Sequence, residues 1–133
     1  MKNKVLKTDL MRAIRKARKT ARNGGREIAG LLIYNGHFME LLETRNTYQK
    51  GGHFQYDERQ IKTIMKAVKE LGHEIVGTFH SHPAYIAKPG EGDLNGALED
   101  SLMLVIDCIN SEARLWRIKA GKARNVNMEI FEV

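Results

Sequence analysis

The sequence contains few cysteine, proline and aromatic residues. It has one cysteine, Cys108, two prolines and 7% aromatic residues. A lone cysteine excludes an internal disulfide framework and is typical of a reducing compartment. No hydrophobic run approaches the roughly 20 residues that span a bilayer, and no apolar stretch follows the basic start as in a signal peptide. We therefore expect a cytoplasmic protein without a membrane partner.

Proline is confined to one part of the chain. Pro83 and Pro89 stand close together, which predicts an irregular loop in an otherwise regular sequence. The 133 residues are 42% hydrophobic and 29% charged, a composition typical of a globular protein with a core of its own. We expect a single domain that spans residues 1–133.

The net charge of +6 belongs to the N-terminal segment. Residues 1–26 contain ten Lys or Arg residues against one acid, Asp9, whereas the other 107 contain twelve basic and fifteen acidic residues. Apolar residues recur from Leu6 to Ala21, which predicts a basic amphipathic helix within residues 1–26 that packs on the core. Its cationic face is expected to be solvated, and contact with an acidic protein is the second interpretation. Nucleic-acid binding is the least favoured, because only this helix is basic.

Hydrophobic patterns and turn signals predict alternating strands and helices. Asn35-Gly36 indicates a hairpin, Asp57 is placed to cap a helix that ends at Gly72, and Asp93 is expected to open a short helix. The predicted strands are 27–34, 37–44, 74–80, 102–108, 112–119 and 125–132. They predict an α+β (α/β-like) fold in which helices flank a central sheet.

His80 and His82 are the strongest chemical signal. On a strand, side chains at i and i+2 point the same way, so the two imidazoles share one face. Pro83 stops the strand directly after the pair. Asp93 follows eleven residues after His82, where a returning loop can add an oxygen ligand. Two histidines and one carboxylate leave a fourth position for water, which is the arrangement of catalytic zinc sites.

Glu27 is the best candidate for a base beside such a metal. It begins an otherwise apolar segment, where a carboxylate is costly unless it has a purpose or a partner. From the residues alone, two interpretations remain open. Glu27 either takes a proton in the reaction or pairs with Arg22 or Arg26 at the mouth of the strand.

Together these residues resemble the JAMM (MPN+) zinc metalloprotease family. The matching segments are Glu27-Ile28-Ala29-Gly30-Leu31-Leu32, Val76-Gly77-Thr78-Phe79-His80-Ser81-His82-Pro83 and Gly92-Asp93-Leu94. The resemblance implies the cytidine-deaminase-like JAMM/MPN core, a curved mixed sheet flanked by helices. It also implies that His80, His82 and Asp93 bind one zinc ion and that Glu27 is the general base of a hydrolase acting on amide or isopeptide bonds.

The sequence departs from the family at Gly90. The family usually has a serine there, three residues before the aspartate, which is thought to steady the oxyanion. Losing one such donor typically costs about 10²–10³ in rate. A backbone N–H freed by the glycines is one substitute, and Ser81, between the two histidines, is expected to point to the opposite face and stiffen the loop. The alternative function is a weakly active or non-catalytic metal-containing binding or scaffold domain.

The length suggests which members of the family the chain is most like. About 130 residues leave no room for the insertions of the chain-specific deubiquitinating members, so a compact prokaryotic-type member is implied. Such members cut C-terminal tails or adducts of ubiquitin-like and sulfur-carrier proteins, and a tail of that kind would bind beside a strand edge. The sequence does not determine the oligomeric state.

The remaining residues with functional potential have simpler interpretations. Cys108 follows an apolar strand and is expected to be a small core residue. Trp116 is expected to cover the sheet, while Tyr85 could line a substrate groove. The histidines outside the motif are expected at the surface or in turns: His37, His53 and His73.

Overall fold

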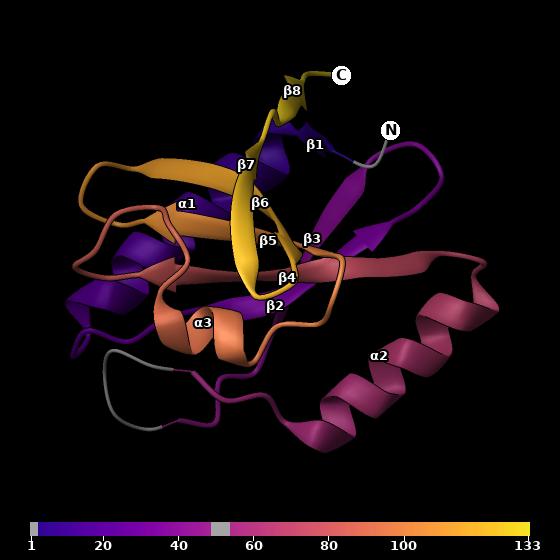
Figure 1. Cartoon of the computed structure of the whole chain (residues 1–133), viewed down its shortest axis with the longest axis horizontal. Helices are drawn as coiled ribbons and strands as arrows, with labels where there is room; N and C mark the ends of the chain where they lie inside the picture. Colours follow the sequence, from indigo (N-terminus) through magenta and orange to yellow (C-terminus); the bar gives the residue numbers. More distant parts are fainter. Residues whose placement is uncertain (1–2, 49–53) are drawn as a thin grey trace.

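A computed structural model describes residues 3–48 and 54–133 and contains one mixed sheet with three helices in that part of the chain. In chain order the elements are β1 (Lys4–Leu6), α1 (Lys7–Arg22), β2 (Ala29–Tyr34), β3 (Met39–Thr44), α2 (Glu58–Glu70), β4 (Glu74–His82), α3 (Glu91–Asn95), β5 (Ser101–Asp107), β6 (Glu112–Lys119), β7 (Lys122–Val126) and β8 (Glu129–Phe131). The strands cross the middle of the molecule, and α2 stands apart from α1 and α3 (Figure 1).

The strand order of the sheet is β7-β6-β5-β4-β2-β3-β1-β8. β4 and β5 run parallel, as do the pairs that β1 makes with β3 and with β8, and the other neighbours are antiparallel. The predicted α+β architecture with a curved mixed sheet is therefore confirmed. β4, the strand that ends in the histidines, lies inside the sheet with β2 on one side and β5 on the other.

The alternation of side chains along β2 separates two hydrophobic layers. Leu32 packs in the layer that contains Leu10 and Ile14 of α1. Leu31 and Ile33 point the other way and pack with Val68 of α2. α1 therefore covers one face of the sheet and α2 the other. Among the described residues, no helix is long and apolar enough to cross a membrane.

Gly30 allows β2 to lie close to the Phe79 ring of β4. Gly30 lies opposite Phe79 in the strand register. A β-carbon at this position would collide with the Phe79 ring and with the carbonyl oxygen of Leu42. The glycine of the Glu-x-x-Gly segment is thus required by packing, since a larger side chain would push β2 away from β4.

The N-terminal segment differs from its prediction, because the basic helix does not include Leu6. Residues Lys4–Leu6 form β1, which pairs with β3 and β8, and α1 begins at Lys7. The predicted strand 125–132 was also wrong as a single element, since β7 ends at Val126 and β8 begins at Glu129. Both differences arise from pairing between distant segments, which local periodicity does not report.

Three boundaries near the site also differ from the predicted ranges. β2 begins at Ala29, so Glu27 precedes the strand instead of lying in it, and β4 continues through His82 instead of ending at His80. α3 begins at Glu91, two residues before Asp93. The parallel neighbour β5 extends β4, because it supplies hydrogen-bonding partners up to the pair His82 and Asp107.

α2 begins as predicted but buries less of its apolar stripe. The Asp57 side chain accepts hydrogen bonds from the N–H groups of Arg59 and Gln60 and so caps the helix. Val68 is buried, whereas Met65 and Leu71 are 53% and 68% exposed. The helical spacing of Met65, Val68 and Leu71 in the sequence predicts one apolar stripe facing the core, and the structure buries only part of it. Met65 instead lines a groove that leads to Asp93.

Candidate metal centre

Three ligand-type atoms converge where β4 ends. His80 Nε2, His82 Nε2 and Asp93 Oδ2 lie 3.1 Å from one another in all three pairs. His80 is fully buried and His82 is 8% exposed. The strand alternation of β4 places both imidazoles on the same face, and the first turn of α3 brings Asp93 to them. The structure thus brings together the three residues that the sequence singled out as metal ligands.

The donor set fits zinc in chemistry and in size. Imidazole nitrogens and a carboxylate oxygen are usual zinc ligands at about 2.0–2.1 Å, and a tetrahedral shell of that radius separates its ligands by about 3.3 Å. The observed separations of 3.1 Å are close to that value. Three atoms with lone pairs this close together need a cation between them, either a shared proton or a metal ion.

The backbone of the following loop fixes the His82 ring. His82 Nδ1 lies 2.9 Å from the carbonyl oxygen of Ile86, which can only accept, so the ring donates from Nδ1. In neutral imidazole this leaves Nε2 unprotonated and aimed at Asp93. Trp116 Nε1 in turn donates to the carbonyl oxygen of Ala87 at 2.9 Å and ties the same loop to β6.

Hydrogen bonds within the cluster change the pKa values of Asp93 and His82. Burial alone would raise the pKa of Asp93, but hydrogen bonds with His80, His82 and the Gly90 N–H hold it well below its usual range. Burial alone would lower the pKa of His82, but hydrogen bonds to Asp93 and to the Ile86 carbonyl raise it instead. Asp93 is therefore a carboxylate at neutral pH, ready to bind a cation.

Glu27 lies beside this cluster and forms no ion pair with a Lys or Arg of the described residues. It is 7% exposed and lines a pocket of about 520 Å³ together with His82 and Asp93. Among the described residues no ion pair joins Glu27 to Arg22 or Arg26, so the structure does not contain the pairing that the sequence left open. Burial raises the pKa of Glu27 to about 7, although the charge of His82 opposes this.

The backbone around Glu27 is held from two sides. Asn46 Nδ2 donates to the Glu27 carbonyl oxygen at 2.9 Å. The N–H of Ile28 donates to Ser81 Oγ at 2.9 Å, and the Ser81 N–H donates to the Ile28 carbonyl oxygen. Although Glu27 precedes β2, these contacts place it firmly against the strand that carries the histidines.

Ser81 and Gly90 do not supply a free oxyanion donor. Ser81 is fully buried, and its hydroxyl oxygen accepts a hydrogen bond from the Ile28 N–H on the face away from the histidines. The Gly90 N–H donates to Asp93 Oδ2 at 2.7 Å. Ser81 thus points away from the histidines, as expected, and stiffens the strand, while the Gly90 N–H orients the aspartate and is not free to bind an oxyanion.

Two hollows meet at Asp93. The first is the pocket with Glu27, over which Tyr85 lies with its ring centroid 5.5 Å from that of His82. The second is a groove of about 810 Å³ with a mainly apolar lining that includes Met65, Leu98 and Met103. Gly92 and Asp93 line both hollows. Asp93, one of the three candidate ligands, therefore lies between two hollows that together offer room for an extended chain.

Sequence reasoning missed several residues that support the site. Phe54 stacks on His80 with ring centroids 5.0 Å apart. Trp116 was expected only to cover the sheet, and its bond to the loop was not foreseen. These contacts join segments far apart in the chain, and neither spacing nor residue type indicates them.

The remaining candidates lie where they were expected or outside the described residues. His37 is exposed and His73 is half-buried, and neither belongs to the metal cluster. His53 lies outside the described residues. Cys108 is a buried free thiol and packs in the layer under α1, as predicted for a small core residue.

Comparison with known proteins identifies the family and the fold. Residues 7–119 match the family of prokaryotic homologs of the JAB domain. No curated protein gives a significant match. Protein DSY2949 from Desulfitobacterium hafniense has a solution structure similar to this chain, with a TM-score of 0.78, 24% identity and coverage of 98% of this chain and 92% of that one.

Two further solved structures share the fold at 19% identity and a TM-score of 0.58. They are AF2198, a JAB1/MPN domain protein from Archaeoglobus fulgidus, and a structure described as a JAMM metalloprotease-like zinc site in the proteasome and signalosome. Each similarity covers 99% of this chain and 100% of the other. Since the family match spans most of the sequence and agrees with the architecture, this chain belongs to the prokaryotic JAB-domain family, whose fold is that of the JAB1/MPN/JAMM proteins.

Proposed function

We propose that this protein is a zinc-dependent hydrolase that cleaves an amide or isopeptide bond. The observation that carries the proposal is the convergence of His80, His82 and Asp93 at mutual separations of 3.1 Å. Glu27 lines the pocket into which their open side faces. Two histidines and one carboxylate with room for a further ligand are the donor set of catalytic zinc.

The chemistry divides between the metal and Glu27. His80, His82 and Asp93 would hold the zinc, which would act as a Lewis acid and make a water molecule more acidic. Glu27, with its pKa raised to about 7 by burial, is suited to accept a proton from that water and to pass it to the leaving amine. The bond from His82 to the Ile86 carbonyl keeps the imidazole aimed while this happens.

We propose a C-terminal tail of a ubiquitin-like or sulfur-carrier protein as the substrate. An extended tail fits the depression formed by the groove and the Glu27 pocket, because the two meet at Asp93. β4 is paired on both sides, so a tail cannot add to it as a new strand. The tail would instead lie against residues 54–56, which line the groove.

The test combines metal content with cleavage. Purified protein is expected to contain about one zinc ion per chain by elemental analysis. It should release a fluorophore attached by an amide to the C-terminus of a ubiquitin-like protein. The Glu27→Gln variant should keep its zinc and lose cleavage, whereas His80→Ala should lose both. Protein without zinc, in which His80→Ala also leaves stability unchanged, would refute the proposal.

A second candidate is a metal-containing binding or scaffold domain that turns over slowly or not at all. It is favoured by Gly90, which has no hydroxyl and whose N–H already bonds to Asp93. Such a domain would bind the same tail with zinc in place and leave it intact. Tail binding without product, unchanged by Glu27→Gln, would support this second function.

A further inference from the structure

Seven basic residues of α1 are exposed, and they divide into paired and unpaired groups. Lys7 pairs with Glu132, Arg12 with Asp9 and Lys16 with Glu43. Within residues 3–48 and 54–133 no ion pair involves the other four, which are Arg15, Arg18, Lys19 and Arg22. The uncompensated charge of the helix is therefore confined to its C-terminal half.

The four unpaired residues share one face of α1. Their spacings of three, one and three residues follow the helical repeat and place them along a single stripe. The stripe is about 10 Å long, since each residue advances a helix by about 1.5 Å. We call Arg15, Arg18, Lys19 and Arg22 the cationic stripe. The buried face, with Leu10, Ile14 and Ala17, lies on another side of the helix.

The stripe ends next to the candidate metal centre. Arg18 and Arg22 line a hollow of about 240 Å³ together with Pro83 and Cys108. Pro83 directly follows His82 and also lines the pocket that contains Glu27. Gly24 and Gly25, just beyond the end of α1, line that pocket as well. A protein bound across the metal centre would therefore reach the stripe through the Glu27 pocket.

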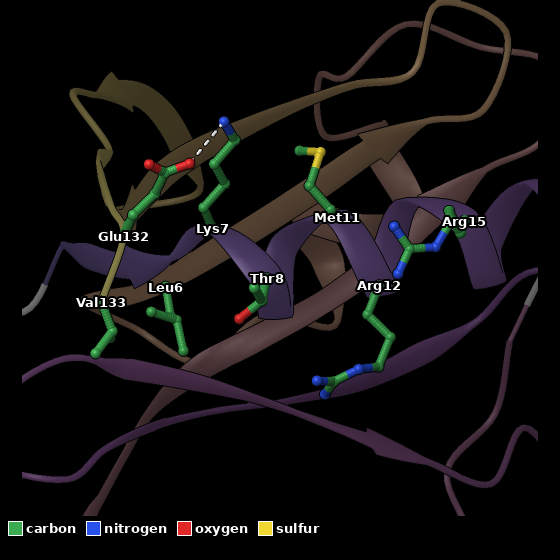
Figure 2. A pocket seen from close by; sticks show the side chains of 8 residues that line it. All are labelled: Leu6, Lys7, Thr8, Met11, Arg12, Arg15, Glu132 and Val133. Atoms are coloured by element: carbon green, nitrogen blue, oxygen red, sulfur yellow. Dashed lines mark ion pairs between the residues drawn. The ribbon is translucent and has the colours of Figure 1, made fainter.

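The opposite end of α1 is hollow too, but of the three basic residues that line it, two are paired and Arg15 alone has no ion pair within the described residues. A pocket of about 660 Å³ lies there, and Figure 2 shows Glu132 joined to Lys7 across it. Arg12, which also lines it, is paired with Asp9. The larger hollow therefore offers less free positive charge than the smaller one beside Pro83.

We propose that the cationic stripe docks an acidic segment of the protein whose tail enters the metal centre. The proposal rests on the proposed function for the identity of the bound molecule as a protein. Charge complementarity and continuity with the Glu27 pocket support an acidic protein. Nucleic acid is less favoured, because four cations on one short stripe contact few phosphates.

The experiment measures binding and does not depend on cleavage. The probe is a short fluorescein-labelled peptide rich in Asp and Glu, and its control is the same peptide with Asn and Gln in their place. Binding to the full chain is followed by fluorescence anisotropy as salt is raised. The Arg18→Glu/Arg22→Glu variant should weaken binding of the acidic peptide by about 10-fold or more, and added salt should weaken wild-type binding.

Lys66→Glu/Lys69→Glu on α2 is the matched control. Both double variants remove two positive and add two negative charges, so each lowers the net charge from +6 to +2. All four side chains are exposed. The control should retain wild-type affinity. If the Arg18 and Arg22 variant loses its helical circular dichroism, Arg18→Gln/Arg22→Gln replaces it, because neutral side chains do not oppose the helix dipole.

The possible outcomes separate the two proposals. Equal loss of affinity in both double variants, equal binding of the neutral peptide, or tighter binding of a DNA duplex would overturn the docking surface. Stripe-dependent peptide binding by a protein that neither holds zinc nor cleaves would support the docking surface and refute only the hydrolase. Cleavage without stripe-dependent binding would refute only the docking surface.

Discussion

His82 Nδ1 lies 2.9 Å from the carbonyl oxygen of Ile86, and this one contact determines which ring nitrogen is available to a metal. A carbonyl oxygen cannot donate, so the proton of the neutral ring is on Nδ1. The lone pair of Nε2 then points to the Asp93 carboxylate. The loop after β4 thus prepares the second histidine for its ligand role.

The ring nitrogens of His82 should be distinguishable by ¹⁵N NMR. At a pH above the pKa of His82, we expect Nδ1 to be protonated and Nε2 unprotonated, and addition of zinc should shift the Nε2 signal. Because the pKa of His82 is raised, protons should compete with zinc and the apparent zinc affinity should fall as the pH decreases. His37→Ala is the control and should change neither result. A neutral ring protonated on Nε2 would contradict the assignment.

Glu27 should make the metal-free protein less stable as pH rises. Its pKa is about 7 in the folded protein against 4.5 as the model value. Below about pH 4.5 the Glu27 carboxyl group is protonated in both the folded and the unfolded protein, so it does not lower the free energy of unfolding. Between 4.5 and 7 the unfolded chain ionises first, so stability falls, by at most about 3 kcal/mol.

Glu27→Gln should remove this dependence. Urea unfolding in the presence of a chelator, at pH values from 4.5 to 8, measures the free energy of unfolding of both proteins. We expect the variant to gain stability over wild type as pH rises and the gain to level off above about pH 7. A difference that stays constant with pH would show that the Glu27 carboxylate is not destabilised by burial.

Gly90→Ser should increase turnover if the missing hydroxyl limits the reaction. A β-carbon at Gly90 would lie 3.5 Å from Asp93 Oδ2, an ordinary contact, so the side chain fits. We expect kcat to rise by up to about 10²–10³, the usual value of one oxyanion donor. Gly90→Ala fills the same space without a hydroxyl and is the control. Equal kcat in the two variants would show that the serine position does not limit this protein.

Trp116→Phe should weaken the metal centre from a distance. It removes the bond to the Ala87 carbonyl and so loosens the loop whose Ile86 carbonyl holds His82. We expect a loss of about 0.5–1.5 kcal/mol in unfolding free energy. Zinc affinity, measured by competition with a chelating dye, should fall by about 10-fold. Tyr34→Phe removes a hydrogen bond to Gly36 in the β2–β3 turn and should leave zinc affinity unchanged.

The sequence by itself determined the features that depend on near neighbours. Strand alternation was enough to place His80 and His82 on one face, and the capping role of Asp57 followed from its position before a helix. The hairpin at Asn35-Gly36 also formed, with Gly36 at a φ of 97°, although its loop spans residues 35–38 and the partner strand begins at Met39 instead of His37. The resemblance to the JAMM family predicted the fold, because its motifs lie on the strands that form the middle of the sheet.

Only the tertiary structure decided how those residues are supported. His82 and Trp116 bond to the backbone carbonyl oxygens of Ile86 and Ala87. Every residue type has such a carbonyl group, so no sequence pattern could indicate these roles. The exposure of Met65 depends on α3 leaving a groove beside α2. The Gly90 N–H is bonded to Asp93 across the first turn of α3, and this contact became visible only once the start of that helix was known. The bond from Trp116 to Ala87 and the groove beside Met65 depend on packing between segments far apart in the chain, whereas spacing along the chain reports only local geometry.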